Sequence, residues 1–200
     1  MVNIRKLFMP AAVFVALSLA ACSQPQIPKD KYYRLQVTKP ENVTSKPVFT
    51  GTIEVERFIA DGLTAGRPIV YSDTSSPHEL QEYHYQFWTE PPVVMLRDQL
   101  IDYLRSANIA DLVVSPESRA RAEHLITARI KRLENVGNAN SAIVEVELRI
   151  HDLKDSKILF LKNYMINEPA KSRSVSDAVL ALNTALSKVY ASFVDDLRKM

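Results

Sequence analysis

Cysteine and glycine are both scarce in this chain of 200 residues, and each scarcity excludes a class of protein. The one cysteine, Cys22, has no partner for an intrachain disulfide, so the fold must depend on packing and hydrogen bonding. None of the four glycines falls in the G-x-x-x-x-G-K-[ST] pattern that cradles phosphates. This excludes nucleotide hydrolysis by a P-loop.

Catalytic and metal-binding motifs are also missing. The four histidines show no H-E-x-x-H or equivalent spacing, so no metal site is predicted. No G-x-S-x-G elbow indicates a serine nucleophile. The carboxylate pairs Asp195-Asp196 and Glu145/Glu147 are interpreted as solvated surface, although folding could bring a catalytic carboxylate pair together. We therefore predict no catalytic residue, no cofactor and no enzyme activity.

The charge of the chain is nearly balanced, with 25 basic and 23 acidic residues. Arg5 and Lys6 are two of the basic residues and precede the apolar run Leu7–Ala21, so the rest of the chain is formally neutral. A protein that binds nucleic acid is expected to have a basic patch. No nucleic-acid partner is predicted.

The first 21 residues have the pattern of a secretory signal. A charged start is followed by an apolar region too short to span a bilayer, and small residues precede Cys22. The run Leu19-Ala20-Ala21-Cys22 resembles the lipobox of bacterial lipoproteins, in which the cysteine is acylated and becomes the new N-terminus. The alternatives are an ordinary secretory signal, an uncleaved anchor and a buried structural cysteine. We predict a signal peptide over residues 1–21 and a lipid on Cys22.

Residues 22–30 are predicted to tether this lipid to a folded domain over residues 31–200. The stretch Ser23–Asp30 contains two prolines and no hydrophobic periodicity. At about 3.3 Å per residue it spans roughly 25 Å, which would hold the domain at the membrane surface. In Gram-negative lipoproteins an Asp after the cysteine commonly signals inner-membrane retention, so Ser23 favours the periplasmic face of the outer membrane.

Hydrophobic periodicity predicts four strands, a helix, four strands and a second helix. The strands are expected over 31–37, 49–59, 68–72, 78–88, 112–114, 122–133, 142–151 and 157–166. One helix opens at Pro91-Pro92, and Ser174 is expected to cap the other. The predicted fold is α+β: a mostly antiparallel sheet with two amphipathic helices packed on it, in a single domain.

Aromatic residues gather before the first helix. Tyr83, Tyr85 and Phe87 are expected on one strand face, followed by the corner Trp88-Thr89-Glu90-Pro91-Pro92. This pattern indicates either a partner surface, because tyrosine and tryptophan are common interface anchors, or a core face with a rigid proline corner.

The strand 158–166 is apolar on both faces, whereas a half-exposed strand alternates apolar with polar residues. Either helices cover both of its faces, which we favour, or one face meets another subunit or a ligand.

The motifs Tyr32-Tyr33-Arg34-Leu35, Ile69-Val70-Tyr71 and Tyr85-Gln86-Phe87-Trp88-Thr89-Glu90-Pro91-Pro92 follow the lipobox and tether in this order. Together they resemble the ABC-type transport auxiliary lipoprotein family, the PqiC/YmbA-like proteins. The resemblance carries over Cys22 as the acylation site. It also carries over, as family-typical partner or structural positions, Tyr32, Tyr33, Tyr71, Trp88, Pro91 and Pro92.

The resemblance implies a non-enzymatic role in which an anchored module docks a periplasmic MCE-domain assembly at the outer membrane. Such systems are thought to move lipids or other hydrophobic compounds. The expected partners are the membrane, an MCE-domain protein and, in a ring-like homo-oligomer, further copies of the chain. A lipid carrier or chaperone with a pocket between sheet and helices is the alternative.

Overall fold

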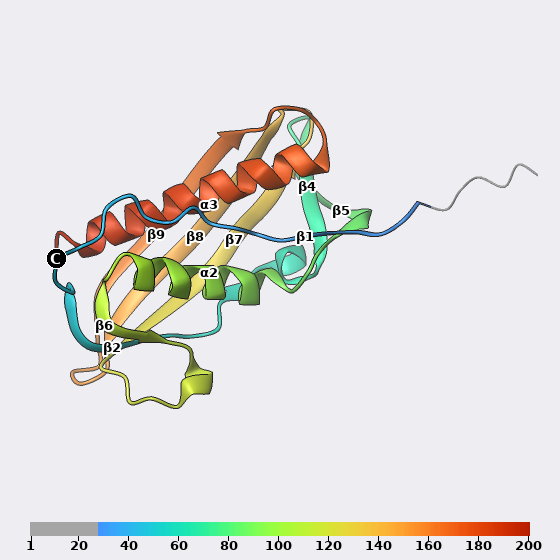
Figure 1. Cartoon of the computed structure of the whole chain (residues 1–200). Coiled ribbons are helices and arrows are strands. Elements are labelled where there is room, and N and C mark those ends of the chain that lie inside the picture. The colour runs from blue at the N-terminus through green and yellow to red at the C-terminus, as the bar shows by residue number, and fades with distance from the viewer. Residues whose placement is uncertain (1–27) are drawn as a thin grey trace, which may run out of the picture.

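The computed structural model describes residues 28–200 (Figure 1). Its three long strands, β7 (His124–Val136), β8 (Ser141–Asp152) and β9 (Lys157–Pro169), form an antiparallel meander. The shorter strands are β1 (Lys31–Tyr33), β2 (Phe49–Val55), β3 (Ile59–Ala60), β4 (Pro68–Asp73), β5 (Ser76–Trp88) and β6 (Ala110–Val114). The helices are α2 (Pro92–Ser106) and α3 (Val175–Leu197), with short 3-10 turns η3 (Gly62–Ala65) and η4 (Pro116–Ser118). Cys22, the signal peptide over 1–21 and most of the tether lie outside the described residues.

Strand β7 organises the sheet because it pairs along both edges. One edge pairs with β8 over its whole length. The other edge pairs in turn with β2, β3 and β4, all of them parallel to it. Strand β6 extends the sheet beyond β2, while β5 and then β1 extend it beyond β4. Within residues 28–200 these strands make one nine-stranded sheet.

The prediction of a mostly antiparallel sheet is wrong. Within the described chain, five of the eight strand pairings are parallel, and the antiparallel ones join β4 to β5, β7 to β8 and β8 to β9. The parallel partners of β7 are separated from it by long stretches of chain, including α2. Such pairing leaves no local signature, whereas the β8–β9 hairpin is read from its turn. The fold is mixed α/β, with a large sheet, two helices and a single domain.

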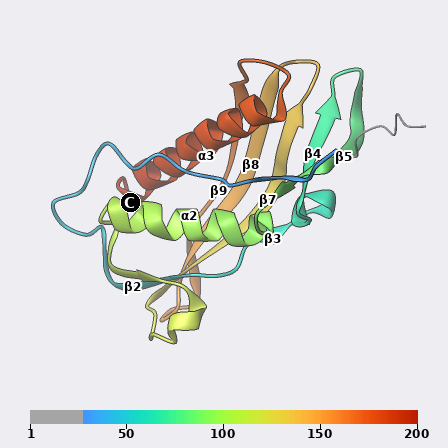
Figure 2. The same cartoon turned by 45° about the vertical axis from the view of Figure 1, so that its right-hand side comes forward.

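Helices α2 and α3 lie side by side on the same face of the sheet (Figures 1 and 2). The strict alternation of β8 explains this arrangement, because Val144, Val146 and Leu148 are fully buried beneath α3 while the residues between them are partly exposed. The predicted helix stripes meet this face: Leu96 and Leu100 of α2, like Leu182 and Leu186 of α3, are also fully buried.

The helix starts follow the sequence prediction. Pro91 is the N-cap of α2 and Pro92 its first residue. At α3, the hydroxyl of Ser174 accepts a 3.1 Å hydrogen bond from the backbone N–H of Asp177. Both features satisfy or remove backbone donors that a helix start leaves unpaired.

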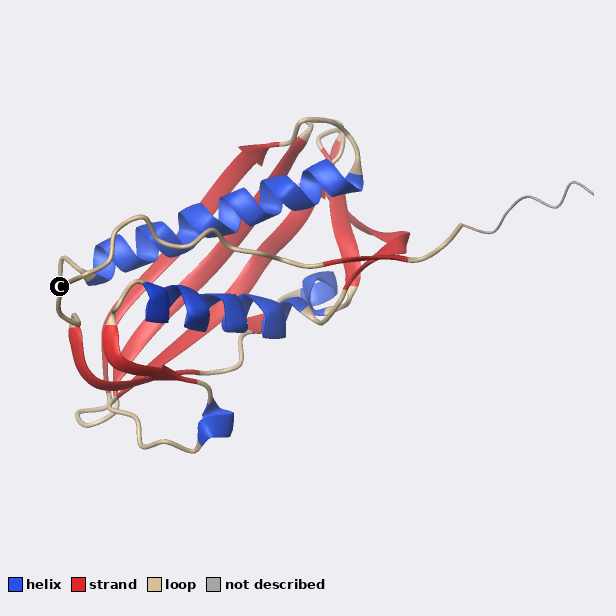
Figure 3. Cartoon of the chain, viewed as in Figure 1, coloured by secondary structure: helices blue, strands red, loops and turns tan. Residues whose placement is uncertain are grey.

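The strand predicted over 31–37 ends at Tyr33. The chain then passes along α2 and α3 (Figure 3). Its next amides are held by helix side chains: Gln36 N–H donates to Asn183, Val37 N–H to Gln99 and Thr38 N–H to Ser187, at 2.8–3.0 Å. Because these amides donate to side chains, β1 does not continue beyond Tyr33 as a hydrogen-bonded strand. The strand predicted over 49–59 is likewise split into β2 and β3.

Candidate functional site

The motif residues lie at one end of the sheet, where β1 pairs in parallel with the end of β5. Tyr32 is opposite Phe87 and Tyr33 is opposite Trp88 in this register. The two pairs face opposite sides of the sheet, since side chains alternate along a strand. Trp88 is 1% exposed, whereas Tyr32 is 55% exposed. The structure therefore divides the motif into a buried and an exposed part.

The buried part of the motif forms hydrogen bonds that hold the corner between β5 and α2 in place. Trp88 donates its backbone N–H to the Arg67 carbonyl at 2.7 Å, and the Arg67 side chain donates back to the Trp88 carbonyl at 3.1 Å. The Pro91 carbonyl accepts from Val94 and Met95 in the first turn of α2. Trp88 therefore contributes to the core, and Pro91 and Pro92 form the start of α2.

The exposed part begins with Tyr32. Its ring stacks on Phe87 with 5.8 Å between centroids, and the Arg67 guanidinium lies 5.5 Å from the Tyr32 centroid. A cation over an aromatic face is attracted by the ring quadrupole. The neighbouring Tyr33 is held by a 2.7 Å hydrogen bond from its hydroxyl to Gln86.

A second aromatic pair continues this surface on β4 and β5. The rings of Tyr71 and Tyr83 are 4.4 Å apart, and Asn135 donates a 2.8 Å hydrogen bond to the Tyr83 hydroxyl. Burial raises the pKa of Tyr83, so its phenol stays neutral. The Tyr71 hydroxyl donates to Gln81. These bonds fix both rings in one orientation.

A hollow of about 440 Å³ lies between the aromatic pair Tyr32–Phe87 and the aromatic pair Tyr71–Tyr83. It is lined by Pro68, Tyr71, Gln81, Glu82, Tyr83, His84 and Phe87. We call the exposed Tyr32, the half-buried Tyr71, Tyr83 and Phe87, and Arg67 together the aromatic surface. Fixed rings, a cation and amide or carboxylate groups at the rim are typical of a protein-binding surface.

The prediction that Tyr83, Tyr85 and Phe87 alternate onto one strand face is wrong. The register between β4 and β5 shifts between Pro68 and Val70, which places extra residues on β5 and breaks the alternation. Tyr85 is 40% exposed, with its ring beside that of His84. Sequence reasoning missed Arg67 of the aromatic surface and Pro68 of the hollow, because they lie in a loop and at a strand start without periodicity.

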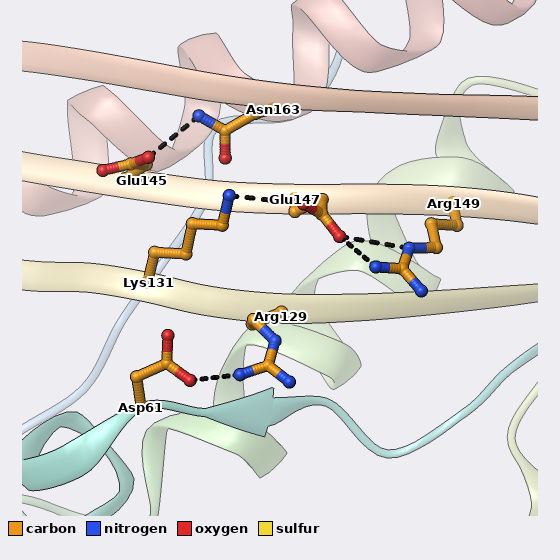
Figure 4. A network of polar contacts seen from close by, with 7 residues as sticks. All are labelled: Asp61, Arg129, Lys131, Glu145, Glu147, Arg149 and Asn163. Carbon is orange, nitrogen blue, oxygen red and sulfur yellow. Dashed lines mark hydrogen bonds and ion pairs between the residues drawn. The ribbon is translucent and has the colours of Figure 1, made fainter.

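The open face of β7 and β8 has a polar network instead (Figure 4). Glu147 pairs with Arg149 and, at 3.2 Å, with Lys131. These cations hold the pKa of Glu147 below its usual value, so the carboxylate is ionised and has no proton to give as a general acid. On the same face Asn163 donates to Glu145 at 2.9 Å.

The second carboxylate pair, Asp195 and Asp196, also forms salt bridges with basic side chains. Asp195 pairs with Arg198 at 2.9 Å, and Asp196 pairs with Lys162 at 2.7 Å. Across residues 28–200, no group of three or more His, Cys, Asp or Glu side chains is placed to hold a metal ion. In the same residues no helix is long and apolar enough to cross a bilayer.

Strand β9 contradicts the interpretation that helices cover both of its faces. Both helices lie on one side, and the opposite side exposes Ile158, Leu161 and Met165 by 55%, 51% and 59%. Leu159, at an irregularity in the β8–β9 register, is 38% exposed. The second possibility read from the sequence, that one face meets another subunit or a ligand, stays a prediction.

Solved structures with a similar fold exist, although no curated protein matches the chain. A crystal structure of a protein from Xanthomonas campestris aligns with a TM-score of 0.70 at 18% identity, covering 82% of this chain and 92% of that one. Another crystal structure, described only as that of an uncharacterized protein, aligns with a TM-score of 0.68 at 12% identity. The alignment covers 85% of this chain and 99% of that one. At these identities the likeness shows the fold alone.

A family model gives the more specific result. The model described as the ABC-type transport auxiliary lipoprotein component matches residues 33–193. The match includes the motif positions Tyr33, Tyr71, Trp88, Pro91 and Pro92, together with α2, the meander and most of α3. Because it spans most of the chain, the protein belongs to the family of ABC-type transport auxiliary lipoprotein components.

Proposed function

We propose that the protein is anchored by a lipid on Cys22 to the periplasmic face of the outer membrane and docks an MCE-type ABC transport system there. The cargo would be lipids or other hydrophobic compounds. The observation that carries the proposal is the family match over residues 33–193. The signal-like start of the sequence and its Leu-Ala-Ala-Cys run support the anchor.

The aromatic surface is the part of the domain that we assign to docking. It borders β1, whose first residue is Lys31, and a fully extended chain from Cys22 to Lys31 spans about 30 Å. The surface would therefore face the region close to the membrane where a periplasm-spanning partner must end. Its fixed tyrosine rings expose contact area at a small cost in side-chain entropy.

Photo-crosslinking in cells tests this assignment. A photoreactive amino acid at Tyr71 or Tyr32 is expected to capture an MCE-domain protein encoded near this gene. Leu180 on the outward side of α3 is 56% exposed and serves as the matched control position. Equal capture from Leu180, or capture of no MCE-domain protein from either aromatic position, would reject docking through this surface.

The alternative function is a periplasmic lipid carrier, which the exposed apolar residues of β9 favour. The interior of the domain does not support it, because the space between sheet and helices is filled by a packed core in which Val146, Leu148 and Leu186 are fully buried. Lipid extraction from a soluble version that starts at Ser23 decides between the two functions. Stoichiometric lipid in that extract would favour the carrier.

A further inference from the structure

Strand β9 is an open sheet edge of unusual character. Among the described strands it pairs only with β8, so the backbone N–H and C=O groups along its other side have no strand partner. Proteins protect such edges with charges, prolines or short strands. From Ile158 to Asn167 the side chains on the open face are uncharged, and the strand is 13 residues long.

The apolar character of the open face is confined to this edge. On β7 and β8 the same face has the network of Lys131, Glu147 and Arg149, which needs water around it (Figure 4). On β9 it has Leu161 and Met165, each more than half exposed, on either side of Asn163. An apolar stripe at an open edge, bordered by charges, is a pattern expected of an interface.

We propose that β9 pairs antiparallel with β9 of a second copy of this chain, about a twofold axis at Asn163. In this register Leu161 of each copy lies opposite Met165 of the other, and the two Asn163 residues face each other. On the helix side Phe160 lies opposite Ile166. Leu161 and Met165 thus meet across the axis, which is the self-complementarity that a twofold interface requires, while Ile158 lies farther out, opposite Glu168.

Charge complementarity on the helix side supports a second copy as the occupant. Within one chain Asp196 accepts hydrogen bonds from Tyr164 at 2.8 Å and Lys162 at 2.7 Å, and the Lys162 ammonium lies 5.0 Å from the Tyr164 ring centroid. The proposed register places Lys162 of each copy opposite Tyr164 of the other. Each Asp196–Tyr164 pair would then gain a second cation at the interface, without a new acidic partner being needed.

Other registers are less complementary. An axis at Met165 would leave Leu161 opposite Pro169, so the pairing of Leu161 with Met165 would be lost. A shift by one residue would turn every side chain of one copy to the wrong face. The proposal stands apart from docking, because β9 is at the opposite side of the sheet from β1 and β5.

Disulfide capture tests the register. The chain has one natural cysteine, so a cysteine introduced at the axis can bond to its equivalent in the second copy. Residues directly opposite in an antiparallel pair have Cβ atoms about 4.5–5.5 Å apart, close to the spacing of a disulfide. Asn163→Cys in the full-length protein, oxidised in the membrane and in detergent, is expected to run as a dimer at twice the monomer mass.

Asn167→Cys is the matched control, since it lies on the same strand and face but about 25 Å from its equivalent in the proposed register. It is expected to form no covalent dimer, as is the unmodified chain, which controls for Cys22. Equal dimer from both variants, no dimer from Asn163→Cys, or its capture by a different protein would each overturn the proposal.

A charge at the edge supplies a second test. Met165→Lys is expected to halve the particle mass in light scattering of the detergent-solubilised protein, while leaving the circular dichroism spectrum unchanged. Leu153→Lys changes a 44% exposed leucine outside β9 and should leave the mass at the dimer value. A wild-type protein already at the monomer mass, or a Met165→Lys variant still at twice that mass, would contradict pairing through β9.

Discussion

Tyr190 of α3 donates a 2.7 Å hydrogen bond to the backbone carbonyl of Leu96 on α2, and both residues are fully buried. This bond joins the two helices on top of the sheet. Tyr190→Phe keeps the ring and removes only the hydroxyl, so no large cavity forms. We expect the free energy of unfolding to fall by about 1 kcal/mol, the usual net contribution of such a bond, in denaturant titrations.

Tyr85→Phe is the control for this measurement, because the Tyr85 ring is 40% exposed. Its unfolding midpoint should equal that of the wild type. A midpoint for Tyr190→Phe that also equals the wild type would show that the hydroxyl adds nothing to helix pairing.

The two sides of the β1–β5 pairing should respond differently to mutation. Trp88→Ala removes a side chain that is 1% exposed, and we expect a loss of about 3–5 kcal/mol in stability, typical of a large-to-small change in a core. Tyr32→Ala removes a 55% exposed ring, so it should change stability by less than about 1 kcal/mol while reducing capture of the docking partner. Similar losses of stability in both variants would remove the distinction between corner and surface.

Gly51 occupies a backbone conformation with φ of +85°, at a register shift in β2. A Cβ there would come within 2.5 Å of the Glu123 carboxylate, which accepts a 2.7 Å hydrogen bond from the Thr52 amide. Gly51→Ala is therefore expected to lower stability by about 1–2 kcal/mol through strain and displacement of Glu123. Gly137→Ala, where a Cβ has open space, is the comparison and should be nearly neutral in thermal melts.

The fall in the free energy of unfolding at acid pH should depend on Asp196. The Lys162 and Tyr164 hydrogen bonds hold its pKa below the ordinary value of 3.8. A carboxyl whose folded pKa is lowered adds stability above its unfolded pKa, and this is lost as the pH falls through the folded value. We expect Asp196→Asn to lose stability at neutral pH and to show a flatter decline below about pH 4. An unchanged decline at acid pH would show that the carboxylate is not favoured in the folded state.

Local patterns predicted the helices and the β8–β9 hairpin correctly. Pro91-Pro92, the Ser174 cap and the alternation of Val144, Val146 and Leu148 each act within a few residues of chain. These features need no knowledge of distant partners, because propensity, capping and face alternation decide them.

Contacts between distant segments were not predictable. The edge of β7 opposite β8 takes three separate parallel strands, and the segment after Tyr33 gives its amides to Gln99, Asn183 and Ser187. The aromatic surface likewise depends on the β4–β5 register shift, which brings Phe87 opposite Pro68. The sequence shows that Ile158 and Leu161 are apolar, but only the arrangement of the helices shows that nothing in the described chain covers them.

The proposed anchor makes the last prediction, which separates attachment from folding. Cys22 precedes the folded domain that we propose over residues 31–200, so Cys22→Ala is expected to leave the unfolding curve of the domain unchanged. Labelled fatty acid should no longer be incorporated, and the protein should leave the membrane fraction, because the acyl chains supply the membrane affinity. Transport by the associated system would then fail.

Ser23→Asp is the companion variant: it should retain the label but move the protein to the inner-membrane fraction. Label in Cys22→Ala, or normal transport without an anchor, would contradict the proposed role of this residue.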